Sequence, residues 1–304
     1  MLSHQRHPHL FPHALWLTLI VLATSTTAEN QPSRPTGPYL GQTPPGKTPV
    51  VFAPGLVSTD AHEFGFSMNP EGTEIYFSRG TGETNIKQIM VARLVNGVWI
   101  EPAVLFPDFP GEQFEPCVTP DGRYLYFMAF LPGDGTRRPD IDMYRAERKG
   151  DGWGTPYRLG PPFNTGGSMF PSVTRDGVVY ATDPKSGGND IALARPTADS
   201  FGPYENLGAP INTAAPEAYG FIAPDESFLI FCRMAPTGGG LMVSFLMPDR
   251  TWSEPQQIPI GMNGGTPFVS RDGKYLFFVA GRMPSDIYWV DFDIVRALKP
   301  KDAQ

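Results

Sequence analysis

A short turn motif recurs five times along this chain, and its spacing limits the possible folds more than any other feature. The third residue of each copy is acidic, and the fourth is glycine in four of the five copies. The copies are Asn69-Pro70-Glu71-Gly72, Thr119-Pro120-Asp121-Gly122, Thr174-Arg175-Asp176-Gly177, Ala223-Pro224-Asp225-Glu226 and Ser270-Arg271-Asp272-Gly273. Their acidic residues are 50, 55, 49 and 47 positions apart. Proline presets the second turn position and glycine accepts the left-handed conformation that ends it, so each copy predicts a tight turn.

Strand-like segments flank every turn. An apolar run precedes each turn and another follows it, as in Phe114–Val118 and Leu125–Phe127. A third run follows, for example Asp142-Met143-Tyr144, and then an aromatic residue before a proline, such as Trp99 and Pro102. Four short strands in each period of about 50 residues are typical of the blades of a β-propeller. We therefore predict an all-β chain with a five-bladed propeller of four-stranded blades.

The two ends of the repeat region complement each other. The fifth period ends near Lys299 without a fourth strand, whereas residues 48–52 match residues 101–105 of the first period. Because an open ring would leave unpaired strand edges, we expect the N-terminal strand to complete the last blade and close the ring. One propeller then occupies residues 49–304.

The repeat also resembles a known family. The pattern Pro-Asp-Gly-x-x-Leu-x-Phe at 120–127, with Asp-Ile-Tyr at 286–288 and Trp-x-x-Pro at 99–102, resembles the WD40-like repeat of TolB-type β-propellers. The resemblance covers about 250 residues; it departs at Glu226, which replaces the turn glycine, and at Gln88, which replaces the aspartate before a third strand. It implies an exported binding or scaffold module, although one fold of this kind carries many functions.

The N-terminus differs from the rest of the chain. Arg6 and four histidines precede a ten-residue apolar run at 14–23, which is shorter than the roughly 20 residues that span a bilayer. The run is followed by Thr26-Thr27-Ala28, so we predict a signal peptide at 1–28, with an uncleaved membrane anchor as the alternative. Residues 29–48 predict a proline-rich linker. The mature protein is then secreted or periplasmic, without stable membrane insertion.

Composition excludes some classes of protein. The net charge of −7 argues against a nucleic-acid binder, which needs basic patches to neutralise phosphate. Only Cys117 and Cys232 are present, both within apolar strand patterns, and we expect buried free thiols. We expect no cofactor and a monomer. We also expect no metal, because Arg137 and Arg138 interrupt the loop acids Asp134, Asp140 and Asp142.

Counting from the turns brings a set of polar residues to one mouth of the central channel. Inner strands begin at this mouth and second strands return to it, because neighbouring strands are antiparallel. The candidate ligand-binding residues are His62, Glu63, Arg79, Glu115, Asp183, Glu217 and Arg233.

This set has more than one interpretation. Its acids and arginines could pair across blades and cap the channel, because desolvated charges are usually paired. They could instead bind a small polar ligand, glycan-like or carboxylate-like, or a protein partner. The alternative function is a glycoside hydrolase that uses Glu63, Glu115 and Glu217, since that reaction needs at least two carboxylates around one bond. No known catalytic motif matches, so we assign no catalytic residue and favour binding.

Overall fold

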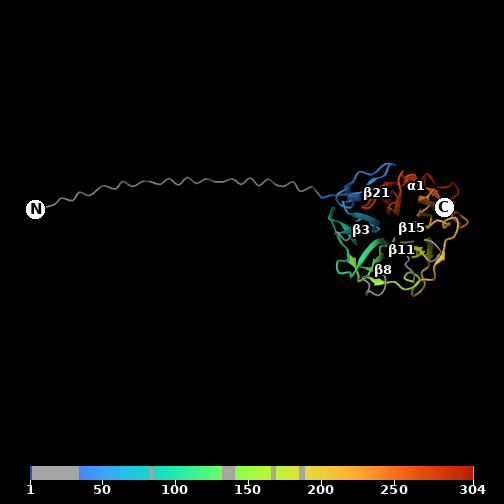
Figure 1. Ribbon diagram of the computed structural model, residues 1–304, viewed down its shortest axis with the longest axis horizontal. Coiled ribbons are helices and arrows are strands. Elements are labelled where there is room, and N and C mark those ends of the chain that lie inside the picture. Colours follow the sequence, from blue (N-terminus) through green and yellow to red (C-terminus); the bar gives the residue numbers. More distant parts are fainter. Residues whose placement is uncertain are drawn as a thin grey trace. The chain divides into compact units, whose positions relative to one another are not determined.

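The computed structural model describes Met1 and residues 34–82, 85–131, 141–165, 169–184, 189–237 and 239–303. The chain divides into two units, Met1–Ser33 and Arg34–Gln304, and all described strands belong to the second. These strands form five antiparallel sheets arranged as a ring (Figure 1). The predicted all-β, five-bladed propeller is therefore confirmed.

Each blade uses four consecutive strands except the last, and blade 2 has one additional short strand. Blade 1 contains β2 (His62–Met68), β3 (Glu74–Thr81), β4 (Ile86–Val95) and β5 (Val98–Val104). Blade 2 contains β6 (Glu112–Val118), β7 (Tyr124–Phe130), β8 (Ile141–Lys149), β9 (Gly152–Trp153) and β10 (Tyr157–Arg158). Blade 3 contains β11 (Met169–Val173), β12 (Val179–Asp183), β13 (Asp190–Ala194) and β14 (Glu205–Asn206).

The remaining strands complete the ring. Blade 4 contains β15 (Glu217–Ile222), β16 (Phe228–Arg233), β17 (Gly240–Phe245) and β18 (Gln256–Gln257). Blade 5 contains β19 (Gly264–Val269), β20 (Tyr275–Ala280), β21 (Asp286–Asp291) and β1 (Val50–Val51). The described helices are the short 3-10 turn η1 (Pro38–Gly41) and α1 (Asp293–Arg296).

All five predicted turns form. In each, the backbone N–H of the fourth residue donates to the carbonyl of the first, at 2.8–3.1 Å. The fourth residue always has positive φ, including Glu226 at 61°, where the glycine is missing. Glu226 also accepts hydrogen bonds from the Tyr180 hydroxyl at 2.8 Å and from Arg250 at 3.2 Å. These bonds offset the backbone strain that a non-glycine residue has in this region.

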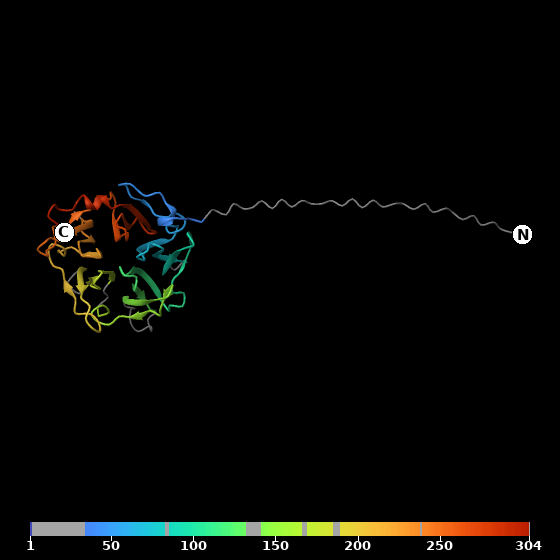
Figure 2. The same ribbon diagram turned by 180° about the vertical axis from the view of Figure 1, so that it is seen from behind.

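The N-terminal strand closes the ring. Val50 and Val51 of β1 pair with Trp289 and Tyr288 of β21. Figures 1 and 2 show the blue start of the second unit lying along its red end. Phe52 follows β1 directly, is fully buried, and meets the rings of Phe66, Phe277 and Trp289 edge-on at 5.1–5.6 Å. The predicted closure is confirmed, and hydrophobic packing reinforces it.

The described part of the predicted linker packs against the ring. The Trp99 indole N–H of β5 donates to the Gly37 carbonyl at 2.7 Å, and the Tyr39 hydroxyl donates to Asp272 at 2.8 Å. Leu40 is buried. From Arg34 onward this segment therefore connects the outer strand of blade 1 to the turn of blade 5.

Candidate functional site

A bulge in every inner strand shapes the centre of the ring. Each inner strand shifts register by an extra residue against its neighbour, and that residue has a left-handed backbone. The left-handed residues are Gly65, Glu115, Phe170, Tyr219 and Thr266, with φ between 41° and 59°. Because a bulge re-aims the side chain at its position, these residues no longer follow the two-residue alternation of their strands.

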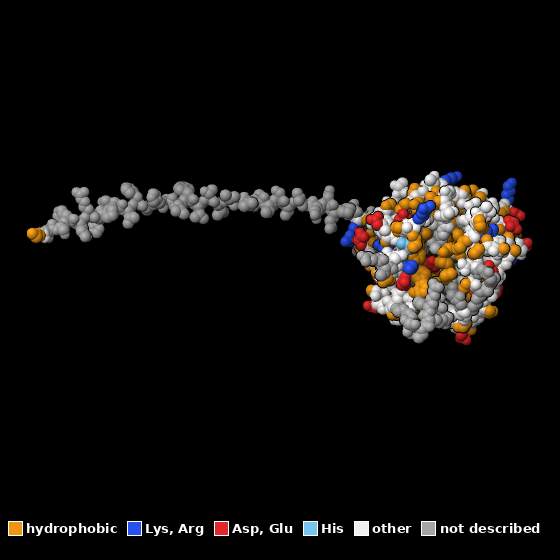
Figure 3. Space-filling model, in the orientation of Figure 1, with side chains coloured by type: hydrophobic (Ala, Val, Ile, Leu, Met, Phe, Trp, Pro, Cys, Tyr) orange, Lys and Arg blue, Asp and Glu red, His pale blue; other side chains and the backbone are white. Residues whose placement is uncertain are grey.

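The five bulges surround one cavity of about 50 Å³. Gly65, Glu115, Phe170, Tyr219 and Thr266 line it, together with the residue that follows each of them. Figure 3 shows hydrophobic side chains gathered in the hollow at the middle of the ring. Because a water needs roughly 10–15 Å³ by this measure, the cavity has room for a few waters or for one polar group of a ligand.

Glu115 is the acidic residue of this lining. Its residue exposure is 8%, and its Oε2 has no hydrogen-bond partner. A Cβ at Gly65 would lie 3.2 Å from the Glu115 Cγ, so the glycine leaves the space that this side chain occupies. Burial raises the pKa of Glu115 well above its ordinary value, which favours the neutral carboxylic acid.

Two other groups beside Glu115 are polar. The Oγ1 of Thr266 is buried without a hydrogen-bond partner. Burial, and then the charge of Glu115, raises the pKa of Tyr219 to about 12, so its hydroxyl stays protonated. The cavity therefore offers a carboxylic acid and hydroxyl groups rather than a fixed charge.

Glu63 and Arg79 form an ion pair within blade 1, which we call the blade 1 clamp. The register pairs them across β2 and β3. Arg79 Nε donates to Glu63 Oε1 at 2.7 Å, and Glu63 is fully buried. The N–H of Thr59 donates to Glu63 Oε2 at 3.1 Å, and the Thr59 hydroxyl donates to Oε1 at 2.6 Å. Three donors therefore use most of the acceptor capacity of the buried Glu63 carboxylate.

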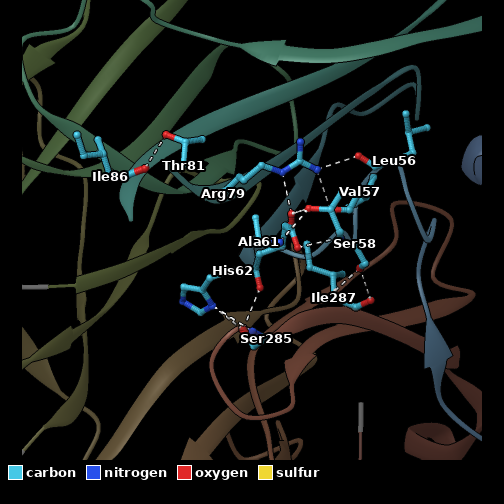
Figure 4. A network of polar contacts seen from close by, with 12 residues as sticks. Leu56, Val57, Ser58, Ala61, His62, Arg79, Thr81, Ile86, Ser285 and Ile287 are labelled. Atoms are coloured by element: carbon cyan, nitrogen blue, oxygen red, sulfur yellow. Dashed lines mark hydrogen bonds and ion pairs between the residues drawn. The ribbon is translucent and has the colours of Figure 1, made fainter. Parts of the chain in front are cut away.

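Arg79 also fixes the loop before β2. Its Nη2 donates to the carbonyls of Leu56 and Val57 at 2.9 and 3.1 Å (Figure 4). The guanidinium is thus used by a carboxylate and two carbonyls of its own blade. These contacts favour the paired, structural interpretation of the predicted cluster. The prediction that acids and arginines pair across blades was wrong for this pair, because β2 and β3 are neighbours in one sheet and bring both side chains together.

Blade 4 repeats this arrangement, which we call the blade 4 clamp. Arg233 Nε donates to Glu217 Oε1 at 2.8 Å, and Nη2 donates to the carbonyls of Pro210 and Ile211 at 3.1 and 2.9 Å. The N–H and hydroxyl of Thr213 donate to Glu217 at 3.0 and 2.7 Å. The equivalent contacts in two blades indicate that both pairs have the same structural role. Each pair fixes the loop that leads into the inner strand.

His62 is also engaged. Its Nδ1 lies 2.8 Å from the hydroxyl of Ser285 (Figure 4). Its ring stacks on Phe64, with 4.8 Å between the ring centroids. Burial, and then the charge of Lys87, lowers the pKa of His62. Because Ser285 is only 5% exposed and bonds to the backbone of Glu63 as well, this pair joins blade 5 to blade 1.

The structure separates the predicted residues into two groups. Glu115 lines the central cavity, whereas Glu63, Arg79, Glu217 and Arg233 belong to the clamps and are not part of its lining. Asp183 ends β12, opposite Asp190 in the register with β13. Asp183 does not line the cavity either.

Some features of the site went unpredicted. The bulges have a partial signal in the sequence, because Pro116, Pro171 and Pro267 follow three of them and proline within a sheet is typical of bulges and edges. Thr59 and Thr213, which bind the two buried glutamates, gave no signal that we recognised.

Other expectations concern metals, thiols and membranes. Within the described ranges, no group of three His, Cys, Asp or Glu side chains could hold a metal ion; Asp134 and Asp140 lie outside those ranges. Cys117 and Cys232 are both free, as expected, but both residues are only partly buried. Among the described residues, no helix is long and apolar enough to span a membrane.

Comparison with known proteins supports the fold. No protein-family profile and no curated protein sequence matches this chain. Among solved structures, it is similar to TolB from Acinetobacter baumannii, with 15% identity, a TM-score of 0.52, and coverage of 78% of this chain and 54% of that one. A putative TolB from Agrobacterium tumefaciens has the same identity and TM-score, with 77% and 78% covered.

A structure described as a glycoside hydrolase is also similar, with 13% identity, a TM-score of 0.53, and coverage of 88% of this chain and 95% of that one. This chain spans only about half the length of the Acinetobacter protein. At such low identities these similarities concern the fold alone. They agree with the TolB-like propeller that the repeat motif predicts.

Proposed function

We propose that this protein is an exported binding module that holds a hydroxyl-bearing ligand at the centre of its propeller. The observation that carries the proposal is Glu115, a buried carboxyl group whose Oε2 has no partner and which lines the central cavity. An unpaired buried polar group costs about 1–3 kcal/mol, and a ligand that completes its hydrogen bonds recovers part of that cost. Export is proposed from the signal-like pattern of residues 1–28.

The chemistry of the cavity favours a neutral ligand with hydroxyl groups, such as a glycan. A protonated Glu115 can donate one hydrogen bond and accept others, and Thr266 can do the same. Hydroxyl groups match this pattern because they too donate and accept. A carboxylate ligand is disfavoured at this mouth, because the guanidinium groups of Arg79 and Arg233 are already bound within their clamps.

Binding is favoured over glycoside hydrolysis. Hydrolysis needs two carboxyl groups that face one bond, about 5–9.5 Å apart. Glu115 is the acid among the residues that line the cavity, whereas Glu63 and Glu217 are held by arginine and threonine in their own blades. A protein partner that inserts a polar side chain into the cavity would use the same chemistry as a glycan.

The test measures the binding of soluble oligosaccharides to the protein by calorimetry, with and without Glu115→Gln. The matched control is Glu112→Gln, which removes a partly exposed carboxylate three residues earlier in β6, where it pairs with Lys87 at 2.9 Å. We expect Glu115→Gln to weaken binding about tenfold, because it changes the hydrogen bonds at the cavity, and Glu112→Gln to leave binding unchanged.

Two results would contradict this proposal. Oligosaccharide binding that is indifferent to Glu115→Gln and Glu115→Ala would remove the cavity from the function. Release of reducing sugar that disappears in Glu115→Gln would instead make the protein a hydrolase.

A further inference from the structure

The five repeat turns lie at the opposite end of the ring from the starts of the inner strands, and we call this end the turn face. The second turn residue is proline in blades 1, 2 and 4 but arginine in blades 3 and 5. Proline stabilises that turn position by presetting φ, and the turns with Arg175 and Arg271 lack this stabilisation. They also belong to the two blades that flank blade 4.

Arg271 is partly buried near the axis of the ring and has no carboxylate partner. Its Nη2 donates to the carbonyls of Met68 and Val118, in blades 1 and 2, at 3.1 and 2.5 Å. Burial lowers the pKa of Arg271, and the acidic residues Asp121 and Glu71 oppose this only through longer-range attraction. Within the described residues, no Asp or Glu oxygen lies within ion-pair distance of this guanidinium.

A groove with a volume of about 340 Å³ lies between the turns of blades 4 and 5. Arg175, Arg271 and Arg296 line it, and its apolar lining includes Phe221, Phe228 and Phe292. The volume is within the range of small-molecule sites, which are mainly apolar with a few polar groups that orient the ligand.

The charges around this groove are unevenly compensated. Arg296 is ion-paired with Asp293 at 2.5 Å and stacks over Phe292. Asp225, the acidic residue of the lining, accepts hydrogen bonds from Ser227 and attracts Arg175 only at longer range.

Arg175 is exposed and makes no side-chain hydrogen bond or ion pair among the described residues. Among the charged residues that line the groove, three arginines, Arg175, Arg271 and Arg296, face the carboxylate of Asp225, in a protein whose net charge is −7.

We propose that this groove binds a monovalent organic anion, a carboxylate attached to an apolar body. The carboxylate would bind Arg175, since a guanidinium without other partners can offer a carboxylate two parallel hydrogen bonds. Arg271, whose Nε and Nη2 are used by the carbonyls of Met68 and Val118, would add its positive charge at longer range. The hydrocarbon would cover the phenylalanines of the groove. The proposal rests on residues other than Glu115 and is independent of the proposed function.

The experiment is calorimetric titration of the protein with octanoate, and with octanol and inorganic phosphate as separate probes. We expect octanoate to bind at least tenfold more tightly than either of the others, because only octanoate supplies both the charge and the apolar body. Arg175→Gln should weaken octanoate binding about tenfold or more. Because the side chain of Arg175 makes no hydrogen bond within the described residues, this variant should fold normally. An Arg271 variant would in addition lose hydrogen bonds to two backbone carbonyls.

The matched control is Arg195→Gln, an exposed arginine of the same blade that pairs with Glu205 at 3.1 Å and does not line the groove. It should leave octanoate binding unchanged, as should Glu115→Gln. Equal binding of octanol, or of octanoate to Arg175→Gln, would overturn the proposal, as would tighter binding of phosphate. Absence of octanoate binding would do the same without affecting the proposal for Glu115.

Discussion

Removal of Arg233 tests whether the clamps are structural. In the blade 4 clamp, the side chain of Glu217 is fully buried and that of Arg233 is 15% exposed. Arg233→Ala leaves a buried carboxylate without its ion-pair partner, a change that usually costs about 3–5 kcal/mol. The two hydrogen bonds from Thr213 remain, so we expect about 3 kcal/mol. At roughly 2–4 °C per kcal/mol for a domain of this size, the melting temperature should fall about 6–12 °C.

Denaturant unfolding of four proteins measures the coupling directly. They are the wild type, Arg233→Ala, Glu217→Gln and the double variant, and the cycle isolates the energy of the pair. Arg195→Ala is the control, because its pair with Glu205 is about half exposed at both side chains and should contribute less than about 1 kcal/mol.

If Arg233→Ala has the melting temperature of the wild type and loses ligand binding instead, the blade 4 clamp is not structural. Arg233 would then be a ligand-binding group, as one interpretation of the sequence allows. Arg79→Ala must also behave like Arg233→Ala, since the two clamps make equivalent contacts. A large difference between them would refute the argument from repetition.

Four further outcomes are expected. Deleting residues 1–57 removes β1 and should cause early melting or aggregation; a melting temperature equal to that of the intact ring would contradict closure by this strand. Glu115→Gln should stabilise the protein at pH 8 but not at pH 4. Because the pKa of Glu115 is raised in the folded state, the stability of the wild type falls as pH rises, by at most about 1.4 kcal/mol per pH unit. Denaturant titrations at both pH values measure the difference. Burial raises the pKa of the Cys117 thiol to about 11, so it should react with a thiol reagent at pH 8 only after unfolding; prompt labelling of the native protein would show it to be accessible. Mass spectrometry of the exported protein should find Glu29 at the N-terminus after cleavage behind Ala28, and a product that begins at Met1 would exclude cleavage.

The repeat made much of this fold predictable. Antiparallel strands on either side of a tight turn return to the same end of the sheet, so counting from each turn predicted that Glu63, Arg79, Glu217 and Arg233 lie at one mouth. The pairing of each glutamate with the arginine of its own blade was not predicted. The missing fourth strand predicted the closure of the ring. Both results follow from backbone pairing, which depends on position in the repeat more than on side-chain detail.

The surroundings of Glu115 could not be predicted in the same way. Its bulge adds one residue to β6, which breaks the alternation that placed it beside Glu63. The partners of Glu63 were also hidden, because Thr59 lies in a loop whose path follows no period. Strand register can thus be predicted from a repeat, whereas the surroundings of a buried carboxyl group depend on loops and bulges.

Repetition of contacts separates structural from functional groups in this ring. The two clamps bind the equivalent carbonyls and threonine groups in blades 1 and 4, as expected of groups that meet a need common to several blades. Glu115 occupies a position where the other blades have glycine, phenylalanine, tyrosine and threonine, and no group in the described residues binds its Oε2. Arg175 and Arg271 share a turn position but not their contacts, since one is exposed and the other partly buried against two carbonyls. Contacts that recur from blade to blade indicate a structural role in the blade. Both proposals therefore rest on residues whose contacts do not recur, Glu115 and Arg175.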